Sequence, residues 1–131
     1  MPYEFKVQTS KRCQMVDITR LVCEAIRELG TTDGSVAVFV PHTTAGITIQ
    51  ENADPDVVRD LLMELERIVP FEDGYRHVEG NAAAHIKSSL VGASALLLVE
   101  KGEPVLGTWQ GVYFCEFDGP RTRRVWVKSL G

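Results

Sequence analysis

Residues 36–55 read VAVFVPHTTAGITIQENADP, and this stretch predicts two strands and the start of a helix. Residues 36–40 are almost wholly apolar, which indicates a strand buried on both faces. Residues 46–50 are rich in β-branched side chains and predict a second strand. Asp54 followed by Pro55 predicts a helix start, because an aspartate caps free backbone amides and proline fits the first helical position. Strands and a helix in this order favour the α+β class.

The flanking sequence continues to alternate between strands and helices. Residues 3–9 alternate between apolar and polar, which predicts a half-buried strand, and Asp17 is expected to cap a helix that runs to about Leu29. Pro70 ends the second helix, and Asn81 is expected to cap a third, short one. From residue 93 onward we expect strands, at residues 95–99, 109–117 and 124–127, with turns at 101–104 and 118–120. The total is about three helices and about six to eight strands, an α+β arrangement.

The composition is that of an ordinary globular protein. The 131 residues are 44% hydrophobic and 24% charged, which predicts a single domain over residues 1–131. The net charge of −4 argues against general binding of nucleic acid. We expect no signal peptide and no membrane span, because no apolar stretch approaches about 20 residues. The cysteines, Cys13, Cys23 and Cys115, lack Cys-x-x-Cys spacing and predict reduced thiols in a cytoplasmic protein.

The three histidines, His42, His77 and His85, each lie beside a turn or helix-cap signal. Histidine is the side chain best suited to bind a divalent metal or to move a proton near neutral pH. A corner at residues 80–81 can turn His77 and His85 toward one ion, with His42 as a third ligand and further positions open. The alternative is structural: His42 caps a strand end, His77 is exposed and His85 is half packed.

Basic and hydroxyl side chains near the third helix suggest a phosphate site. The helix start at Asn81 offers free amides and a positive dipole end, and Arg76, Lys87 and Ser88 lie close to it in the sequence. The alternative is that these are solvated helix residues. Arginines at 121, 123 and 124 form a second basic cluster, whose more common fate is to pair with Glu116 and Asp118 across a hairpin.

Glycines flank Trp109 and Gln110 in the segment 107–111, which indicates tight backbone geometry at the entry to a strand. Trp109 can stack on a flat ring and Gln110 can recognise the ring edge through hydrogen bonds. The alternative is a core tryptophan at a sheet corner. Long strands in the C-terminal half would leave edges or apolar faces uncovered in a monomer, so we expect an oligomer.

Four ordered motifs resemble one known family. They are HTTAGITIQENADPD at 42–56, His77 with a Gly-Asn pair at 80–81, AHIKSS at 84–89 and LGTWQG at 106–111. Together they resemble the YjbQ family, whose members are often labelled secondary thiamine-phosphate synthase. The resemblance covers essentially the whole chain. It implies an α+β domain with two packed sheets and about three helices, assembled as a homotrimer.

The resemblance also implies a metal site near a subunit boundary, formed by His42, His77 and His85. Family members often carry a histidine or an acidic residue where this chain has Ala83. A fourth ligand from that position is therefore absent, which leaves room for water or substrate. The implied cofactor is a divalent ion, with zinc, magnesium and manganese all open.

The implied activity is that of a metal-assisted transferase, which joins an aminopyrimidine methyl diphosphate to a thiazole phosphate and releases diphosphate. Such a reaction needs cations at the leaving group and separate contacts to each ring. By this resemblance the three histidines with Arg76 and Lys87 neutralise diphosphate, Trp109 and Gln110 hold the pyrimidine, and Asn81 with Ser88, or Arg121 with Arg123 and Arg124, hold the thiazole phosphate. Two alternatives stay open: a non-catalytic trimer that binds a metal or an anionic metabolite, and a metal-dependent phosphohydrolase.

Overall fold

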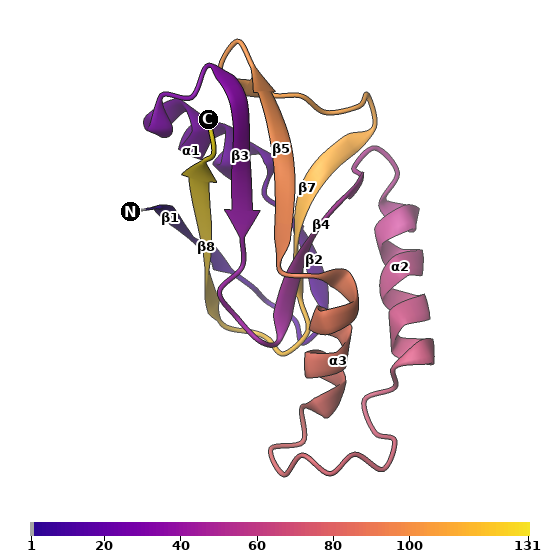
Figure 1. Cartoon of the computed structure of the whole chain (residues 1–131). Coiled ribbons are helices and arrows are strands. Elements are labelled where there is room, and N and C mark those ends of the chain that lie inside the picture. Colours follow the sequence, from indigo (N-terminus) through magenta and orange to yellow (C-terminus); the bar gives the residue numbers. More distant parts are fainter. Residues whose placement is uncertain (1) are drawn as a thin grey trace.

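The chain folds into two antiparallel sheets and three helices, as Figure 1 shows for the computed structural model, which describes residues 2–131. The five-stranded sheet has the order β1-β8-β3-β5-β6, with bounds β1 (Tyr3–Gln8), β3 (Asp33–Phe39), β5 (Ser94–Glu100), β6 (Glu103–Pro104) and β8 (Thr122–Ser129). The three-stranded sheet has the order β2-β7-β4, with bounds β2 (Gln14–Asp17), β4 (Ala45–Glu51) and β7 (Gln110–Glu116). The predicted α+β class with two sheets is confirmed.

The helices are α1 (Thr19–Leu29), α2 (Pro55–Ile68) and α3 (Ala82–Val91). Asp54 caps α2 as predicted, with its carboxylate accepting a hydrogen bond from the Asp56 amide at 2.9 Å. Asp17 belongs to β2, a strand that the sequence did not predict, and α1 begins two residues later. The Asp17 carboxylate still accepts hydrogen bonds from the amide and the hydroxyl of Thr19. Among residues 2–131, no helix combines the length and the apolar character that crossing a membrane requires.

The main core lies between the two sheets and includes the inner face of α1. It contains Val22 and Ile26 from α1, Val36 and Val38 from β3, and Phe114 from β7, all fully buried. The prediction that β3 is buried on both faces is wrong. Val36 and Val38 face the core, whereas Phe39 is 42% exposed, because no helix within residues 2–131 covers the outer face of the five-stranded sheet.

The outer face of the three-stranded sheet carries a second, smaller core beneath α2 and α3. Tyr113 and Cys115 of β7 are buried there, with Val58 and Leu65 of α2 packed against them. No residue of α2 is fully buried, so this helix rests on the sheet by one half-buried face. The loop of residues 69–81 between α2 and α3 extends away from the sheets at the bottom of Figure 1.

The end of α3 lies very close to the start of β4. The Ile47 amide donates to the Gly92 carbonyl at 3.0 Å, and a Cβ at Gly46 would lie 2.6 Å from that same oxygen. The Ser88 hydroxyl donates at 2.6 Å to the carbonyl of Thr43, in the turn that leads into β4. These contacts fix α3, and with it His85, next to the segment that carries His42.

Candidate functional site

His77 and His85 form a close pair of imidazoles. His77 lies on the loop 69–81 and His85 in the first turn of α3, and their ring centroids are 5.2 Å apart with the planes at 82°. Since a zinc–nitrogen bond is about 2.0–2.1 Å long, the centroid of a coordinating imidazole lies about 3.2 Å from the ion, and a tetrahedral angle places two centroids about 5.2 Å apart. The spacing of this pair is compatible with two ligands of one metal ion, and it is also that of an ordinary edge-to-face contact between two rings.

His42 has a different role in the structure. The last residue pair between β3 and β8 is Phe39 with Trp126, and beyond it Pro41 turns the chain away from the sheet. The backbone amide of Arg124, which loses its strand partner there, donates to Nε2 of His42 at 2.9 Å. An imidazole nitrogen that accepts a hydrogen bond carries no proton, so the neutral ring carries its proton on Nδ1. The structural alternative for His42, a strand-end cap, is thus observed.

The electrostatic surroundings of His42 also favour the neutral ring. Burial lowers the pKa of His42 below its ordinary value, and the nearby positive charges of Arg123 and Arg124 lower it further. An imidazole whose Nε2 is already occupied can serve as a metal ligand only through Nδ1, and only after losing that proton. His42 is therefore set apart from the His77–His85 pair by its chemistry.

Two adjoining pockets meet at His85. One, of about 370 Å³, is lined by His42, Thr43 and His85, together with Ser88 and Ser89. The other, of about 340 Å³, is lined by His77 and His85 with Ala82 and Ile86. Within the part of the chain that the structure describes, no group of three His, Cys, Asp or Glu side chains is close enough to hold a metal. The predicted three-histidine centre is therefore not assembled within one chain. What one chain brings together is the pair of His77 and His85.

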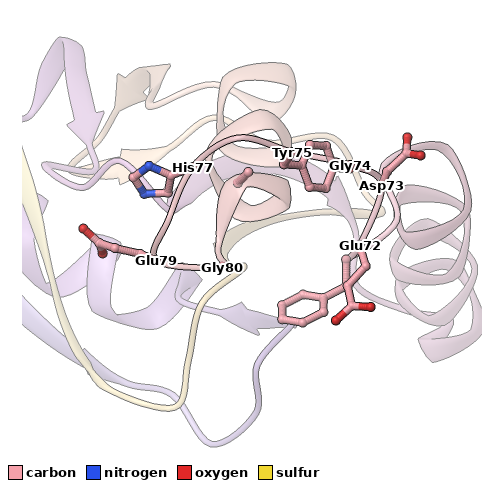
Figure 2. Close-up of a pocket in the computed structure, with 9 residues that line it drawn as sticks. Glu72, Asp73, Gly74, Tyr75, His77, Glu79 and Gly80 are labelled. Atoms are coloured by element: carbon pink, nitrogen blue, oxygen red, sulfur yellow. The ribbon is translucent and has the colours of Figure 1, made fainter.

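The loop 69–81 also lines a pocket of about 430 Å³ that includes His77 (Figure 2). Its lining includes Tyr75 and three acidic residues, Glu72, Asp73 and Glu79. Figure 2 shows Glu79 beside His77, with Glu72 and Asp73 farther along the loop. Three carboxylates disfavour a phosphate in this pocket.

Lys87 does not face an open site. Its side chain is 2% exposed, and its Nζ lies 2.8 Å from Oε1 of Glu66 on α2. A buried ammonium has to be paired, and this lysine pairs with a carboxylate of the protein. In this conformation Lys87 is therefore not positioned for the predicted contact with a diphosphate.

The other predicted phosphate contacts are also largely satisfied within the chain. The Asn81 amide group donates to the Asp118 carboxylate at 2.8 Å, and the same carboxylate pairs with Arg121 at 3.1 Å. The Ser88 hydroxyl is held by the carbonyls of Thr43 and His85. Arg76 is exposed on the loop 69–81. Arg121, half exposed beside the pocket of about 520 Å³ that also includes His42, is the predicted anion contact that remains best placed.

A buried ion pair supports the turn that carries His42. Arg123 and Glu116 are both almost fully buried and make a bidentate contact. Arg123 also donates to the carbonyl and hydroxyl of Thr44, at 3.2 and 2.9 Å. Burial raises the pKa of Glu116, but hydrogen bonds from Arg123, the Asp118 amide and Thr9 outweigh it, and the net pKa is lowered. The predicted pairings of Arg123 with Glu116 and of Arg121 with Asp118 are confirmed. Arg124 pairs instead with Glu4, at 3.7 Å.

Trp109 and Gln110 lie at the far end of the three-stranded sheet from the histidines. Gln110 pairs with Glu51 at the end of β4, whereas Ala45, next to the His42 turn, pairs with Glu116. The ends of this seven-residue strand are six steps of about 3.3 Å apart, a distance of about 20 Å. Trp109 is 63% exposed, so it is neither a core residue nor, within one chain, part of the histidine site.

Comparison with known proteins agrees with this fold and these motifs. The family model described as "UPF0047 protein YjbQ-like" matches residues 3–131. The UPF0047 protein YugU of Bacillus subtilis is 55% identical over 127 residues, covering 96% of each chain, and the UPF0047 protein MJ1081 of Methanocaldococcus jannaschii is 50% identical over 131 residues, covering 100% of this chain and 95% of its own.

Solved structures extend the similarity to three dimensions. An uncharacterised YjbQ/UPF0047 family protein of Clostridium acetobutylicum superposes with a TM-score of 0.95 at 55% identity, covering 98% of this chain and 99% of its own. A hypothetical protein of Aeropyrum pernix superposes with a TM-score of 0.93 at 34% identity, covering 100% of this chain and 98% of its own. The chain therefore belongs to the YjbQ-like UPF0047 family.

Proposed function

We propose that the protein is a homotrimeric, metal-assisted transferase with thiamine-phosphate synthase-like activity, which joins an aminopyrimidine methyl diphosphate to a thiazole phosphate and releases diphosphate. The observation that carries the metal part of this proposal is the His77–His85 pair, with centroids 5.2 Å apart. The substrate part rests on the family resemblance and on the pockets that adjoin these two rings.

His77 and His85 would hold the ion, which when bound would neutralise charge that builds up on a leaving diphosphate. Two imidazoles are donors that suit zinc better than magnesium, which prefers oxygen ligands. Among the divalent ions left open by the sequence, the donor set therefore favours zinc.

The residues around the pair have separate roles in this proposal. His42, with Nε2 held by the Arg124 amide, can donate from Nδ1 to an anionic oxygen of the substrate. Arg121 lines the pocket that adjoins His42 and supplies a positive charge for a phosphate. Arg123 and Ser88 position the turn of residues 43–44 through its carbonyl groups and do not need to touch the substrate.

The homotrimer is proposed from the outer face of the five-stranded sheet. Leu96 and Leu98 of β5 are 60% and 58% exposed, and Phe39 of β3 stacks on Trp126 of β8 beside them. An apolar surface of this kind is expected to be covered by another protein surface. Trp109 and Gln110 lie far from the histidines of their own chain, so a role for them in the same site would require a neighbouring subunit. The predicted cytoplasmic location is supported by the free cysteines.

The main alternative is a non-catalytic trimer that binds a metal or an anionic metabolite. The pairing of Lys87 with Glu66 favours it, because that pairing removes one cation from the set a diphosphate would need. Metal-dependent hydrolysis of a single phosphorylated substrate is the other alternative, and free phosphate released from one substrate would distinguish it.

The test is to purify untagged protein, measure metal per subunit by elemental analysis, and assay coupling of the two thiamine precursors with diphosphate release. His77→Ala and His85→Ala are expected to lose both the metal and the coupling activity. The matched control is Val78→Ala, next to His77 and 96% exposed, which should keep both. Coupling by metal-free protein would reject the metal's role, and bound metal without turnover would favour the non-catalytic trimer.

A further inference from the structure

The turn between β3 and β4 uses its hydrogen-bond acceptors within the protein. The Thr43 carbonyl accepts from the Ser88 hydroxyl at 2.6 Å. The carbonyl and the hydroxyl oxygen of Thr44 accept from Arg123, at 3.2 and 2.9 Å. Nε2 of His42 accepts from a backbone amide of β8 at 2.9 Å. Each of these contacts occupies an acceptor atom of the turn and none of them uses its backbone N–H groups.

The N–H groups of the same turn are left without a partner. Among residues 2–131, no acceptor lies within hydrogen-bond distance of the backbone amides of His42, Thr43 and Thr44. The same holds for the amide of Ala93, which lines the same pocket, and for Nδ1–H of His42. Thr44 is only 5% exposed, and amides of buried residues are nearly always paired. An unpaired amide there indicates a position for water or a ligand.

Arg123 is a buried cation that also keeps donors free. The residue is 2% exposed, and its Nε and Nη2 donate to Glu116 and Thr44. Nη1 has no acceptor within residues 2–131, yet it does not belong to the unpaired side-chain atoms that are sealed from solvent. Since Arg123 lines the pocket of about 520 Å³ together with the turn, Nη1 opens into that pocket. A guanidinium N–H that faces a cavity is suited to bind an oxyanion.

The charges on this side of the pocket are positive. The charged residues in its lining are Arg121 and Arg123, and no acidic residue of the described chain belongs to the lining. At the ring of His42, burial lowers the pKa, and the charges of two arginines lower it by more than Glu116 raises it. The potential at this wall therefore favours an anion.

The opposite lining of the pocket is apolar. It consists of Phe39, Val40 and Pro41, and Phe39 is 42% exposed. The volume of about 520 Å³ lies within the range of about 300–1,000 Å³ that is typical of small-molecule sites, so there is room for more than a free phosphate ion. A ligand that contacts both sides carries an oxyanion next to a flat or apolar group.

We propose that this pocket binds a small phosphate monoester, and that it does so without a metal ion. The amides of residues 42–44 and of Ala93, Nδ1–H of His42 and the arginine N–H groups donate to the phosphate oxygens. Phe39 and Pro41 pack against the organic group. A phosphate suits this number of donors better than a carboxylate, because it offers three terminal oxygens as acceptors rather than two.

The inference deepens the proposed function and rests on it for the identity of the monoester, which would be the thiazole phosphate. It assigns the phosphate to the backbone of the His42 turn and the ring contact to Phe39 instead of Trp109. The pocket shares His42 with the pocket that contains His85. The monoester and the proposed metal would therefore lie on either side of the His42 ring.

The test uses the protein in its native assembly, freed of metal by chelation and dialysis. Calorimetric titration is expected to show binding of phenyl phosphate, about ten-fold tighter than that of methyl phosphate, because the apolar wall covers the ring. In ¹H–¹⁵N NMR spectra, the amides of residues 42–44 and 93 should show the largest shifts. No binding to the metal-free protein, or larger shifts at the start of α3 than in the turn, would overturn the inference.

Two variants that each remove one positive charge test the location of the site. Arg121→Gln is expected to weaken binding of phenyl phosphate by at least about ten-fold, because a charged donor is lost. Lys6→Gln removes an exposed charge on β1, outside the pocket lining, and should change the affinity by less than about two-fold because salt screens it. Equal losses in the two variants would mean that phosphate responds to net charge alone, which would reject the pocket.

The outcomes also separate this inference from the proposed transferase. Binding at the turn without coupling of the two thiamine precursors would reject the transferase and keep the phosphate site. Coupling by a protein whose turn amides do not respond to phenyl phosphate would keep the transferase and reject the phosphate site.

Discussion

The imidazole of His42 accepts a hydrogen bond from the backbone amide of Arg124, a residue 82 positions away in the sequence. The ring accepts the hydrogen bond of an amide that lies beyond the last pair between β3 and β8, and it can do so only with an unprotonated Nε2. A side chain that looked like a metal ligand is therefore also a part of the sheet edge. Because this ring also caps the edge of the sheet, protonation of His42 is expected to change the stability of the fold.

His42 should make the metal-free protein less stable in mild acid. Its pKa is lowered on folding, so below the ordinary pKa of a histidine, about 6.5, the unfolded chain binds a proton that the folded protein does not. More protons on the unfolded state means that stability falls as the pH drops, between about pH 7 and pH 5. Urea denaturation in the presence of a chelator should show a steeper fall in the wild type than in His42→Gln. The same slope in both proteins would contradict this.

Lys87 and Glu66 should respond unequally to substitution. Glu66→Ala leaves a buried ammonium without its carboxylate and is expected to destabilise the fold by about 3 kcal/mol. Lys87→Met removes the buried charge and leaves a carboxylate that is 42% exposed to water, so the change should be within about 1 kcal/mol. Denaturant midpoints of the two single variants and the double variant measure this. Equal losses from both single variants would mean that Lys87 is hydrated in solution.

Gly46→Ala should separate α3 from β4. The new Cβ would lie 2.6 Å from the Gly92 carbonyl oxygen, which is backbone and has little room to move. We expect a loss of about 1–3 kcal/mol in unfolding free energy, together with weaker metal binding, because α3 carries His85. Thr48→Ala, two residues along the same strand, adds no atoms and serves as the control. Unchanged stability and metal affinity in Gly46→Ala would show that α3 is not held by this contact.

Leu96→Glu and Leu98→Glu should prevent assembly of the proposed trimer and leave the subunit folded. Both side chains lie on the uncovered face of β5 and are more than half exposed in a single chain. A charge there costs little in the monomer but must be desolvated at an apolar interface. Light scattering should report the mass of three chains for the wild type and of one for the variants, with Val78→Glu as an exposed control. A wild-type mass of one chain would reject the proposed trimer directly.

Much of the fold is predictable from local sequence. The Asp-Pro pair at 54–55 and the alternation at residues 3–9 place α2 and β1 almost to the residue. The errors have physical reasons. β2 is only four residues long and ends on Asp17, whose capping signal for α1 hides it. The apolar run at 36–40 is typical of a strand that is buried on both faces. In this fold one face of the strand belongs to an open sheet surface. The sequence of a strand does not determine which element covers each of its faces.

The candidate site was less accessible to sequence reasoning. The histidines could be singled out, and two of them meet, but which ring faces which depends on contacts distant in sequence, such as the amide of Arg124 on His42. Lys87 was misplaced, although a signal was present: it follows Ala83 and Ala84 at helical spacing of four and three, on the buried face of α3. A lysine in a row of small buried residues indicates an internal ion pair more than a ligand contact.

The attachment of α3 has a consequence for how this site can diverge. His85 is fixed to the sheet through Gly92 and Ser88, whereas His77 belongs to the exposed loop 69–81. The separation of the two rings is therefore set by the loop alone, and a change in its length or sequence alters that separation without disturbing either core. At the proposed metal site, the choice of ion would therefore change through the position of His77 while His85 stays fixed, at almost no cost in stability.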